Sequence, residues 1–347
     1  DRPTGGDDLT VIEFIVIQTI GNSVDFGDLG TGAKDLGANA AGGNATRGVL
    51  TEVGTDVHNP INNITYINVA STGSGQDFGD TTVARDSVAA VNNSTRLVFG
   101  GGDTGDEVQS NVMDYVTIAS TGNGTDFGDL TSARFNHGSA SNSTTGLFAG
   151  GTTGGASSNR KNIIDSITVA STGNATDFGD LTLSMDGVSG ASDSNTASQP
   201  VYVATTLASL GNQAVAQNAQ TMFHFDINTL GDFADFGIID PSVASVNNLA
   251  MLSNSIRGVS SGGAGGITNM SYFNHHSKGR GTDFGDSTVA NKYSAAASSD
   301  TRGIVFVGRN DSNANQNVIE YVTIASAGNA TDFGDSTVVN AFSRAAG

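Results

Sequence analysis

A four-residue motif, Asp-Phe-Gly-Asp, recurs along the whole chain and constrains its fold more than any other feature. One altered copy, Asp235-Phe236-Gly237-Ile238, and six intact copies follow one another at intervals of 48 to 58 residues. The intact copies begin at Asp25, Asp77, Asp126, Asp177, Asp283 and Asp332. A period near fifty residues indicates one supersecondary unit copied many times. A repeat architecture therefore replaces the two-domain estimate that 347 residues would otherwise suggest.

Each repeat unit contains four segments that have the character of short β-strands. In the unit that ends at Asp180, a stretch of small residues comes first, and an apolar run from Thr145 then ends at Gly150-Gly151. Residues 163–170 alternate apolar and polar side chains, which is the period of a half-buried strand. A turn rich in Gly and Asn leads to the Asp-Phe-Gly-Asp copy, which we expect to form the fourth strand.

An aromatic residue precedes the first Asp of the motif by eleven residues in most units, inside the expected third strand. These aromatic residues are Phe14, Tyr66, Tyr115, Tyr272 and Tyr321. Ser166 and His224 occupy the position in two other units. The unit that contains His224 is the most divergent, because residues 200–204 stand where paired glycines are expected.

Composition excludes several classes of protein. The chain is 37% hydrophobic and only 14% charged, with 47 glycines, so that short strands joined by turns suit it better than disorder or a helical bundle. Its formal net charge of −19 disfavours nucleic acid and anionic lipid as partners. The absence of cysteine removes disulfides, thiolate metal sites and thiol nucleophiles. No apolar run reaches the roughly 18 residues that a membrane-spanning helix requires.

The order of conserved features within a unit resembles the kelch repeat. In that family an apolar strand ends in Gly-Gly, a Tyr and then a Trp follow, and an Arg precedes the next strand. Here Gly101-Gly102, Tyr115, Phe127 and Arg134 occur in this order. Two features depart from the kelch pattern: Phe replaces Trp in every copy, and the Arg is kept at two positions only. The Arg positions of successive units hold Arg85, Arg134, Met185, Asn291 and Asn340.

This resemblance implies a β-propeller with four-stranded antiparallel blades as a single domain over residues 1–347. We expect seven blades, with a ring of six as the alternative. The complete units are 29–80, 81–129, 130–180, 181–235, 236–286 and 287–335, and a split blade combines 1–28 with 336–347. Closure of the ring would remove exposed sheet edges. Most of the second strand of the split blade is missing, so we expect further sequence beyond one terminus.

A second resemblance concerns the biological setting. Residues 115–131 look like repeats in largely uncharacterised proteins of marine bacteriophages, cyanophages among them. The likeness implies a non-catalytic virion component of a tail fibre or appendage, located in the virion or outside the cell. Its partners would be other virion proteins or a host-surface glycan, within a larger assembly. The alternatives are a glycan-processing enzyme on a propeller scaffold and an extracellular structural module of a bacterium.

The repeated motif itself is interpreted as structural, with no cofactor. We expect its phenylalanines to pack between blades, its glycine to allow close approach and its acids to bond turn amides. These phenylalanines are Phe26, Phe78, Phe127, Phe178, Phe236, Phe284 and Phe333. Calcium is the alternative, because each copy brings two carboxylates and calcium prefers oxygen ligands. A kinase-like magnesium site is excluded because the accompanying kinase motifs are absent.

An arginine at the start of the second strand supplies the most coherent set of candidate binding residues. The set consists of Arg47, Arg96, Arg257 and Arg302. Equivalent positions in successive blades would form a ring about the propeller axis, which could bind an anionic ligand such as an acidic glycan. The alternative is that each arginine bonds an acid or a carbonyl group of a blade.

No residue is assigned a catalytic role. The histidines occupy unrelated positions in different units, which favours surface or loop roles; they are His58, His137, His224, His275 and His276. Among 34 acidic residues some pair always suits glycosidase chemistry, and nothing in the sequence singles one out. The recurring Asn-x-Thr sequences are explained by turn chemistry; they include those that begin at Asn44, Asn123, Asn174 and Asn329.

Overall fold

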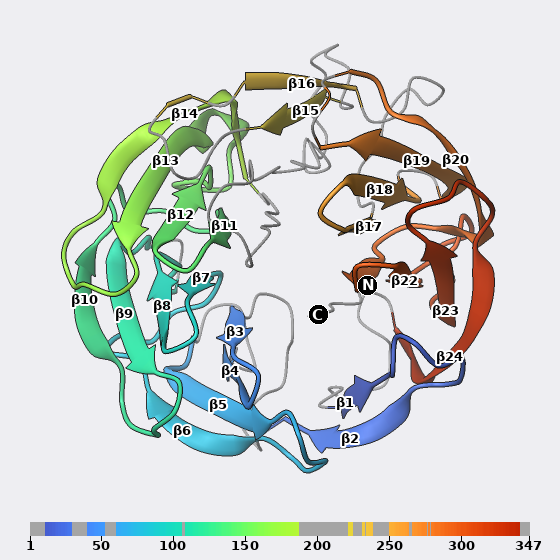
Figure 1. The fold of residues 1–347 in the computed structure, drawn as a ribbon. Coiled ribbons are helices and arrows are strands. Elements are labelled where there is room, and N and C mark those ends of the chain that lie inside the picture. The colour runs from blue at the N-terminus through green and yellow to red at the C-terminus, as the bar shows by residue number, and fades with distance from the viewer. Residues whose placement is uncertain are drawn as a thin grey trace.

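The computed structural model confirms an all-β fold whose sheets are arranged in a ring as a β-propeller (Figure 1). It describes residues 11–29, 40–52, 60–105, 108–186, 221–224, 231–232, 234–238, 250–263, 266–275, 277 and 279–340. Apart from one short 3-10 helix, Ser157–Asn159, every regular element in these ranges is a strand.

Five sheets within the described ranges are complete four-stranded antiparallel blades. The first two blades are β3 (Ala41–Gly43), β4 (Arg47–Thr51), β5 (Asn63–Asn68) and β6 (Gln76–Asp80), then β7 (Ala89–Asn92), β8 (Arg96–Gly100), β9 (Val112–Thr117) and β10 (Thr125–Asp129). The third is β11 (Gly138–Ser141), β12 (Thr145–Ala149), β13 (Lys161–Thr168) and β14 (Thr176–Met185). The last two are β17 (Ala250–Ser253), β18 (Arg257–Ser261), β19 (Ile267–Asn274) and β20 (Thr282–Asn291), then β21 (Ala295–Ser298), β22 (Arg302–Phe306), β23 (Gln316–Thr323) and β24 (Thr331–Asn340).

Two further sheets in the described ranges have two strands each. They pair β1 (Val11–Phe14) with β2 (Val24–Asp28) and β15 (Thr221–His224) with β16 (Ala234–Ile238). The number of complete blades is thus five among the described residues, which differs from the expected seven and from the alternative of six. The segments expected to supply the missing strands, 1–10, 187–220 and 341–347, lie outside the described ranges.

Within each complete blade, strand order follows chain order from the centre of the ring to its rim (Figure 1). The innermost strands β11 and β21 consist of small residues only, Gly-Ser-Ala-Ser and Ala-Ala-Ala-Ser, whereas β17 includes Met251 and Leu252. The second strands β8 and β12 are buried on both faces and therefore have nearly continuous apolar sequences. In β8, Leu97, Val98 and Phe99 are all completely buried.

The antiparallel order gives the ring two distinct ends. We call "turn end" the edge that carries the short links between first and second strands and between third and fourth strands. The opposite edge, the "loop end", carries the links between second and third strands and the connections from one blade to the next. At the turn end, Asn93 closes the β7–β8 hairpin by accepting bonds from the amides of Thr95 and Arg96 at 2.9 and 2.8 Å.

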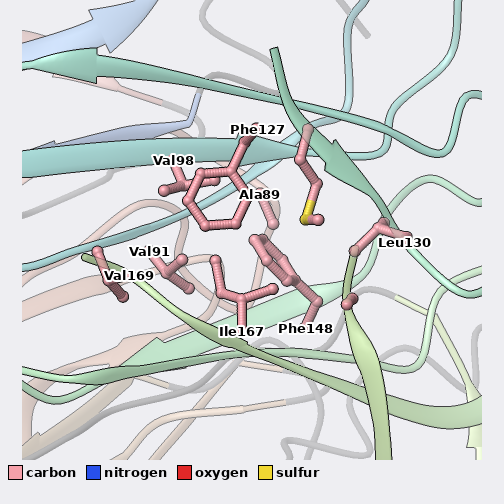
Figure 2. Close-up of a cluster of buried hydrophobic side chains, with 10 residues drawn as sticks. Ala89, Val91, Val98, Phe127, Leu130, Phe148, Ile167 and Val169 are labelled. Atoms are coloured by element: carbon pink, nitrogen blue, oxygen red, sulfur yellow. The ribbon is translucent and has the colours of Figure 1, made fainter. Parts of the chain in front are cut away.

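The hydrophobic core lies between neighbouring blades. Figure 2 shows one such cluster, in which Val91, Val98 and Phe127 of one blade meet Phe148 and Ile167 of the next. Because neighbouring sheets pack face to face, the apolar side chains are buried between blades and not around the axis of the ring.

Candidate functional site

The phenylalanines of the repeated motif are buried at the boundaries between blades. Phe78 and Phe127 are each 2% exposed, and Phe333 is 1% exposed. Phe26, Phe178 and Phe284 are buried as well, whereas the side chain of Phe236 lies outside the described part of the structure. Phe127 packs edge-on against Tyr115 of its own blade, with ring centroids 6.0 Å apart. The same geometry occurs in the pairs Phe14–Phe26, Tyr66–Phe78, Tyr272–Phe284 and Tyr321–Phe333.

The glycine of the motif permits a close approach between blades. Gly128 has a φ of 138°, and a Cβ atom there would lie 2.5 Å from the carbonyl oxygen of Gly173 in the next blade. A side chain at this position would meet backbone that cannot move aside, so the position requires glycine. The same approach joins Gly27 to Gly73, Gly79 to Gly122, Gly179 to Gly231, Gly237 to Gly279, Gly285 to Gly328 and Gly334 to Gly21.

The two acids of the motif take part in the same seam. The first accepts a hydrogen bond from the glycine amide two residues later, as Asp77 does from Gly79 at 3.0 Å. The amide of the second donates to the turn of the next blade, as Asp80 does to Asn123 at 3.2 Å. Asn174 and Asn329 accept equivalent bonds from Asp129 and Asp286. The asparagines of three Asn-x-Thr sequences therefore have a structural task in the seam.

Metal binding would need carboxylates that converge. Among the residues that the structure describes, no group of three or more His, Cys, Asp or Glu side chains is placed so that it could hold a metal ion. In that part of the chain, no helix has the length and apolarity that a membrane crossing requires.

The candidate arginines join adjacent blades at the turn end. The Arg96 guanidinium lies 4.1 Å above the ring of Tyr115 and donates to the carbonyl oxygen of Val169 in the next blade at 3.3 Å. Arg47 pairs with Tyr66 and the carbonyl of Ile118, Arg257 with Tyr272 and Ile324, and Arg302 with Tyr321 and Ile17. The arginine therefore stacks within one blade and bonds the next. Binding of an anion by this set stays a prediction.

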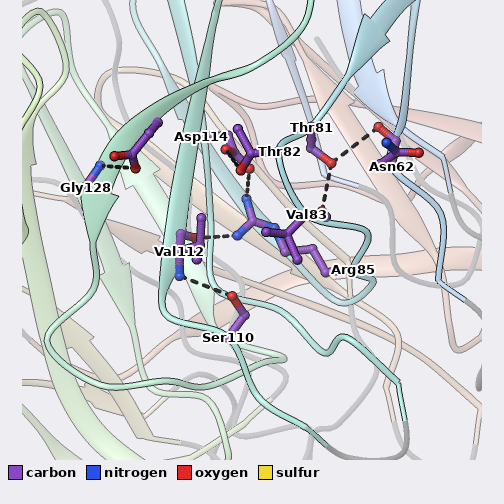
Figure 3. A network of polar contacts seen from close by, with 10 residues as sticks. Asn62, Thr81, Thr82, Val83, Arg85, Ser110, Val112, Asp114 and Gly128 are labelled. Carbon is purple, nitrogen blue, oxygen red and sulfur yellow. Dashed lines mark hydrogen bonds and ion pairs between the residues drawn. The ribbon is translucent and has the colours of Figure 1, made fainter.

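Sequence reasoning missed a second set of buried charges at the loop end. The Arg85 guanidinium contacts the Asp114 carboxylate at 2.5 Å and bonds the carbonyl of Val112, as Figure 3 shows. Thr82, at the connection from the preceding blade, donates to the same carboxylate. Burial lowers the pKa of Arg85, and the neighbouring carboxylate opposes that shift. In the next blade Arg134 and Asp165 form the equivalent pair at 3.0 Å, and both side chains are fully buried.

The blade β21–β24 keeps the carboxyl group and lacks the arginine. Glu320 lies completely buried at the position equivalent to Asp165, and Asn291 replaces the arginine. Both the amide and the hydroxyl of Thr288 donate to Glu320 Oε2 at 2.7 Å. Burial raises the pKa of the Glu320 carboxyl, although the bonds from Thr288 oppose the shift. The sequence does hold a signal for the buried carboxyl groups: an acidic residue stands directly before the aromatic position of the third strand, as at Asp114, Asp165 and Glu320.

Among the histidines, His137 has the most unusual environment. It is buried beside Phe148, with ring centroids 5.7 Å apart. Burial, followed by the positive charge of Arg134, lowers the pKa of His137 to about 3. His275 bonds the carbonyl of Asn254 at 3.0 Å. His58, His276 and the side chain of His224 lie outside the described residues.

A hollow of about 370 Å³ opens at the turn end of the blade β11–β14. Thr145 and Ser166 line it together with the third-to-fourth-strand turn at residues 171–174. The rings of Phe127 and Phe178 complete the wall. No protein-family model matches the chain, and no curated protein sequence matches it either.

Proposed function

We propose that the chain is a non-catalytic β-propeller that serves as a structural and binding component of a bacteriophage particle, in a tail fibre or a neighbouring appendage. Its partner is a host-surface glycan or another virion protein. The proposal rests on the likeness of residues 115–131 to repeats of marine bacteriophage proteins and on one structural observation. The polar groups that recur from unit to unit are engaged in contacts within blades and between neighbouring blades.

That observation applies to both ends of the ring. At the turn end, Arg96 bonds the carbonyl of Val169 in the next blade. At the loop end, Asp165 accepts from the amide of Thr131 at 3.1 Å and pairs with Arg134. Repetition of these groups is thus explained by construction of the ring. A binding function belongs to the surfaces that differ between units.

We also infer that the full ring has seven blades, of which the described residues complete five, and that a split blade combines the two ends of the chain. Two contacts support this count. Phe333 accepts a bond from the amide of Gly21 at 2.8 Å, just as Phe78 accepts one from Gly122 at 2.7 Å. The amide of Thr337 donates to Glu13 at 2.6 Å, which repeats the bond from Thr288 to Glu320. The seven close approaches of glycine pairs also follow one another in a closed circle.

The split blade is tested by crosslinking of introduced cysteines. Because the chain has no native cysteine, only the introduced residues can react. The variant Glu13→Cys/Thr337→Cys, treated with a short bismaleimide, is expected to give a circular product of altered gel mobility. The pair Glu13→Cys/Thr288→Cys is the control, because Thr288 contacts the carboxyl group of another blade. Equal crosslinking of both pairs would contradict the split blade.

The decisive experiment locates the protein. Antibodies raised against the recombinant chain are applied to purified particles of the source bacteriophage, with immunogold labelling and quantitative mass spectrometry of the same particles. We expect a fixed copy number per particle and labelling at the tail or an appendage. Capsid and lysozyme proteins of the same phage serve as the particle and lysate markers. Recovery from the soluble lysate alone, with turnover of a glycan substrate, would support the enzyme alternative and reject this proposal.

A further inference from the structure

Among the five complete blades that the structure describes, one lacks the stacked pair that joins neighbouring blades at the turn end. Four blades carry an arginine at the start of the second strand and a tyrosine in the third, whereas β11–β14 carries Thr145 and Ser166. The positions are equivalent because Thr145 pairs with Thr168 as Arg96 pairs with Thr117. Likewise, Ser166 pairs across to the fourth strand at the position that Tyr115 occupies in its own blade. Both members of the pair are thus replaced together by small hydroxyl residues.

This double replacement coincides with the hollow of about 370 Å³. A guanidinium group and a phenol ring would otherwise occupy the space beside Phe178, as Arg47 and Tyr66 do beside Phe78. The volume lies near the lower bound of the roughly 300–1,000 Å³ found for small-molecule sites, so it suits one sugar ring better than a larger ligand.

The lining selects the chemistry of the ligand. Every described residue that lines the hollow is uncharged, and most carry a hydroxyl group. Asn174 accepts a bond from the amide of Asp129 through Oδ1 at 3.1 Å, which fixes its carboxamide and leaves Nδ2 as a donor. Phe127 and Phe178 also line the hollow, with exposed fractions of 2% and 5%, so a ligand would meet mainly the hydroxyl and amide groups. Such groups suit a sugar, whose hydroxyl groups both donate and accept hydrogen bonds.

An anionic ligand is disfavoured at this place. Thr145 stands where the other blades present a guanidinium group, and the chain as a whole has a net charge of −19. We propose that the hollow between Thr145, Ser166 and the turn at residues 171–174 binds one neutral sugar unit of a glycan. This inference rests on the glycan branch of the proposed function and names the site and the class of sugar.

Saturation-transfer NMR with methyl glycosides of glucose, galactose, mannose and N-acetylglucosamine tests the proposal, and sialic acid is the anionic control. We expect transfer to at least one neutral glycoside and none to sialic acid. The variant Thr145→Arg/Ser166→Tyr restores the pair found in four other blades, so it fills the hollow with a combination that this fold accepts. It is expected to weaken binding at least tenfold while its circular dichroism stays unchanged.

Two further variants make the result specific. Thr145→Val removes one hydroxyl group at nearly constant volume and is expected to weaken binding at least threefold. Thr323→Val makes the same chemical change at an exposed strand position of another blade, outside the hollow, and should leave the affinity unchanged. If Thr145→Arg/Ser166→Tyr bound the glycosides as tightly as the wild type, the proposed site would be wrong, and the sugar would bind elsewhere on the protein. Absence of binding to every neutral glycoside would overturn the site as well, while detection in virions would still decide the proposed function separately.

Discussion

The blades β11–β14 and β21–β24 bury a carboxyl group at the same position of the third strand, but only one of them buries a positive charge beside it. Asp165 pairs with Arg134, and Glu320 faces Asn291 in place of an arginine. Both carboxyl groups accept hydrogen bonds from the threonine that begins the connection between blades, Thr131 or Thr288. The hydrogen-bonding task is therefore common to the two blades, and the charge balance differs.

This comparison indicates that the connection between blades requires a hydrogen-bond acceptor at this position but does not require an ion pair. In β11–β14 the Arg134 guanidinium lies 3.0 Å from the Asp165 carboxylate. In β21–β24 the neutral side chain of Asn291 bonds Ser287 at 2.8 Å, and burial raises the pKa of Glu320. A buried carboxyl group without a cation is stabilised when it takes up a proton. The following predictions test whether the two blades indeed differ in this way.

The largest effect is expected from removal of the cation in the paired blade. Arg134→Met leaves the Asp165 carboxylate fully buried without its partner, which should lower the free energy of unfolding by about 3–5 kcal/mol. Urea unfolding followed by circular dichroism measures the change. The matched variant Arg134→Asn/Asp165→Glu copies the arrangement of β21–β24 and should recover most of the loss. If Arg134→Met lowered the free energy of unfolding by less than about 1 kcal/mol, the Arg134–Asp165 pair would contribute no more than an exposed ion pair does.

The second effect concerns His137, whose counterpart in β21–β24 is Ser294. The folded state holds the pKa of His137 at about 3, below the ordinary value of 6.5. Between these values the unfolded chain binds the proton that the folded chain refuses, so stability falls as the pH falls from 6.5 towards 3. The variant His137→Val carries the residue that the preceding blade has at this position, Val88. Comparison of its free energy of unfolding with that of the wild type should isolate the stability lost through His137.

Urea unfolding at pH 7, 5 and 4 provides the measurement for His137. At about 1.36 kcal/mol per pKa unit, the wild type should lose roughly 2–3 kcal/mol more than the variant between pH 7 and pH 4. Parallel stability profiles of the two proteins would mean that His137 titrates at its ordinary pKa.

The propeller was predictable because its determinants lie close together in the sequence and recur. The spacing of Asp-Phe-Gly-Asp predicted a repeat architecture, and the order of features that resembles the kelch repeat implied the all-β ring. The alternating apolar pattern of residues 163–170 fits strand β13. The structure describes five complete blades and not the expected seven, because residues 1–10, 187–220 and 341–347 lie outside the described ranges.

Bonding of the strand-start arginines to blade carbonyls was the alternative that the sequence offered, and the structure confirms it, but the sequence did not show which carbonyl each arginine reaches. Arg96 bonds the carbonyl of Val169, which lies 73 residues away, and a carbonyl group has no signature in the side-chain sequence. The Arg134–Asp165 pair joins two positions 31 residues apart that meet only when the blade has formed. The hollow had a readable signal, because Ser166 interrupts the aromatic positions. Its meaning depends on the simultaneous replacement at Thr145, which becomes a neighbour only in the folded sheet.

The smallest effect, and the one of opposite sign, is expected at Glu320. Glu320→Gln keeps an acceptor for Thr288 and removes the need to bury a charge. Because the folded state raises the pKa of Glu320 above 4.5, the contribution of its carboxyl to stability is fully present below that value. That contribution is lost as the pH rises through the folded-state pKa. The variant should therefore be more stable than the wild type by about 1 kcal/mol at pH 8 and nearly equal to it at pH 4.

The control for Glu320→Gln is the same chemical change in a paired blade. Asp114→Asn also exchanges a carboxyl group for an amide, but it deprives the buried Arg85 of its counter-charge, so stability should fall instead of rise. Opposite signs for one substitution type at equivalent positions would follow directly from the presence of the arginine in one blade and its absence in the other. Destabilisation by Glu320→Gln at pH 8 would mean that Glu320 is held as a carboxylate, and the contrast between the two blades would then lie in geometry alone.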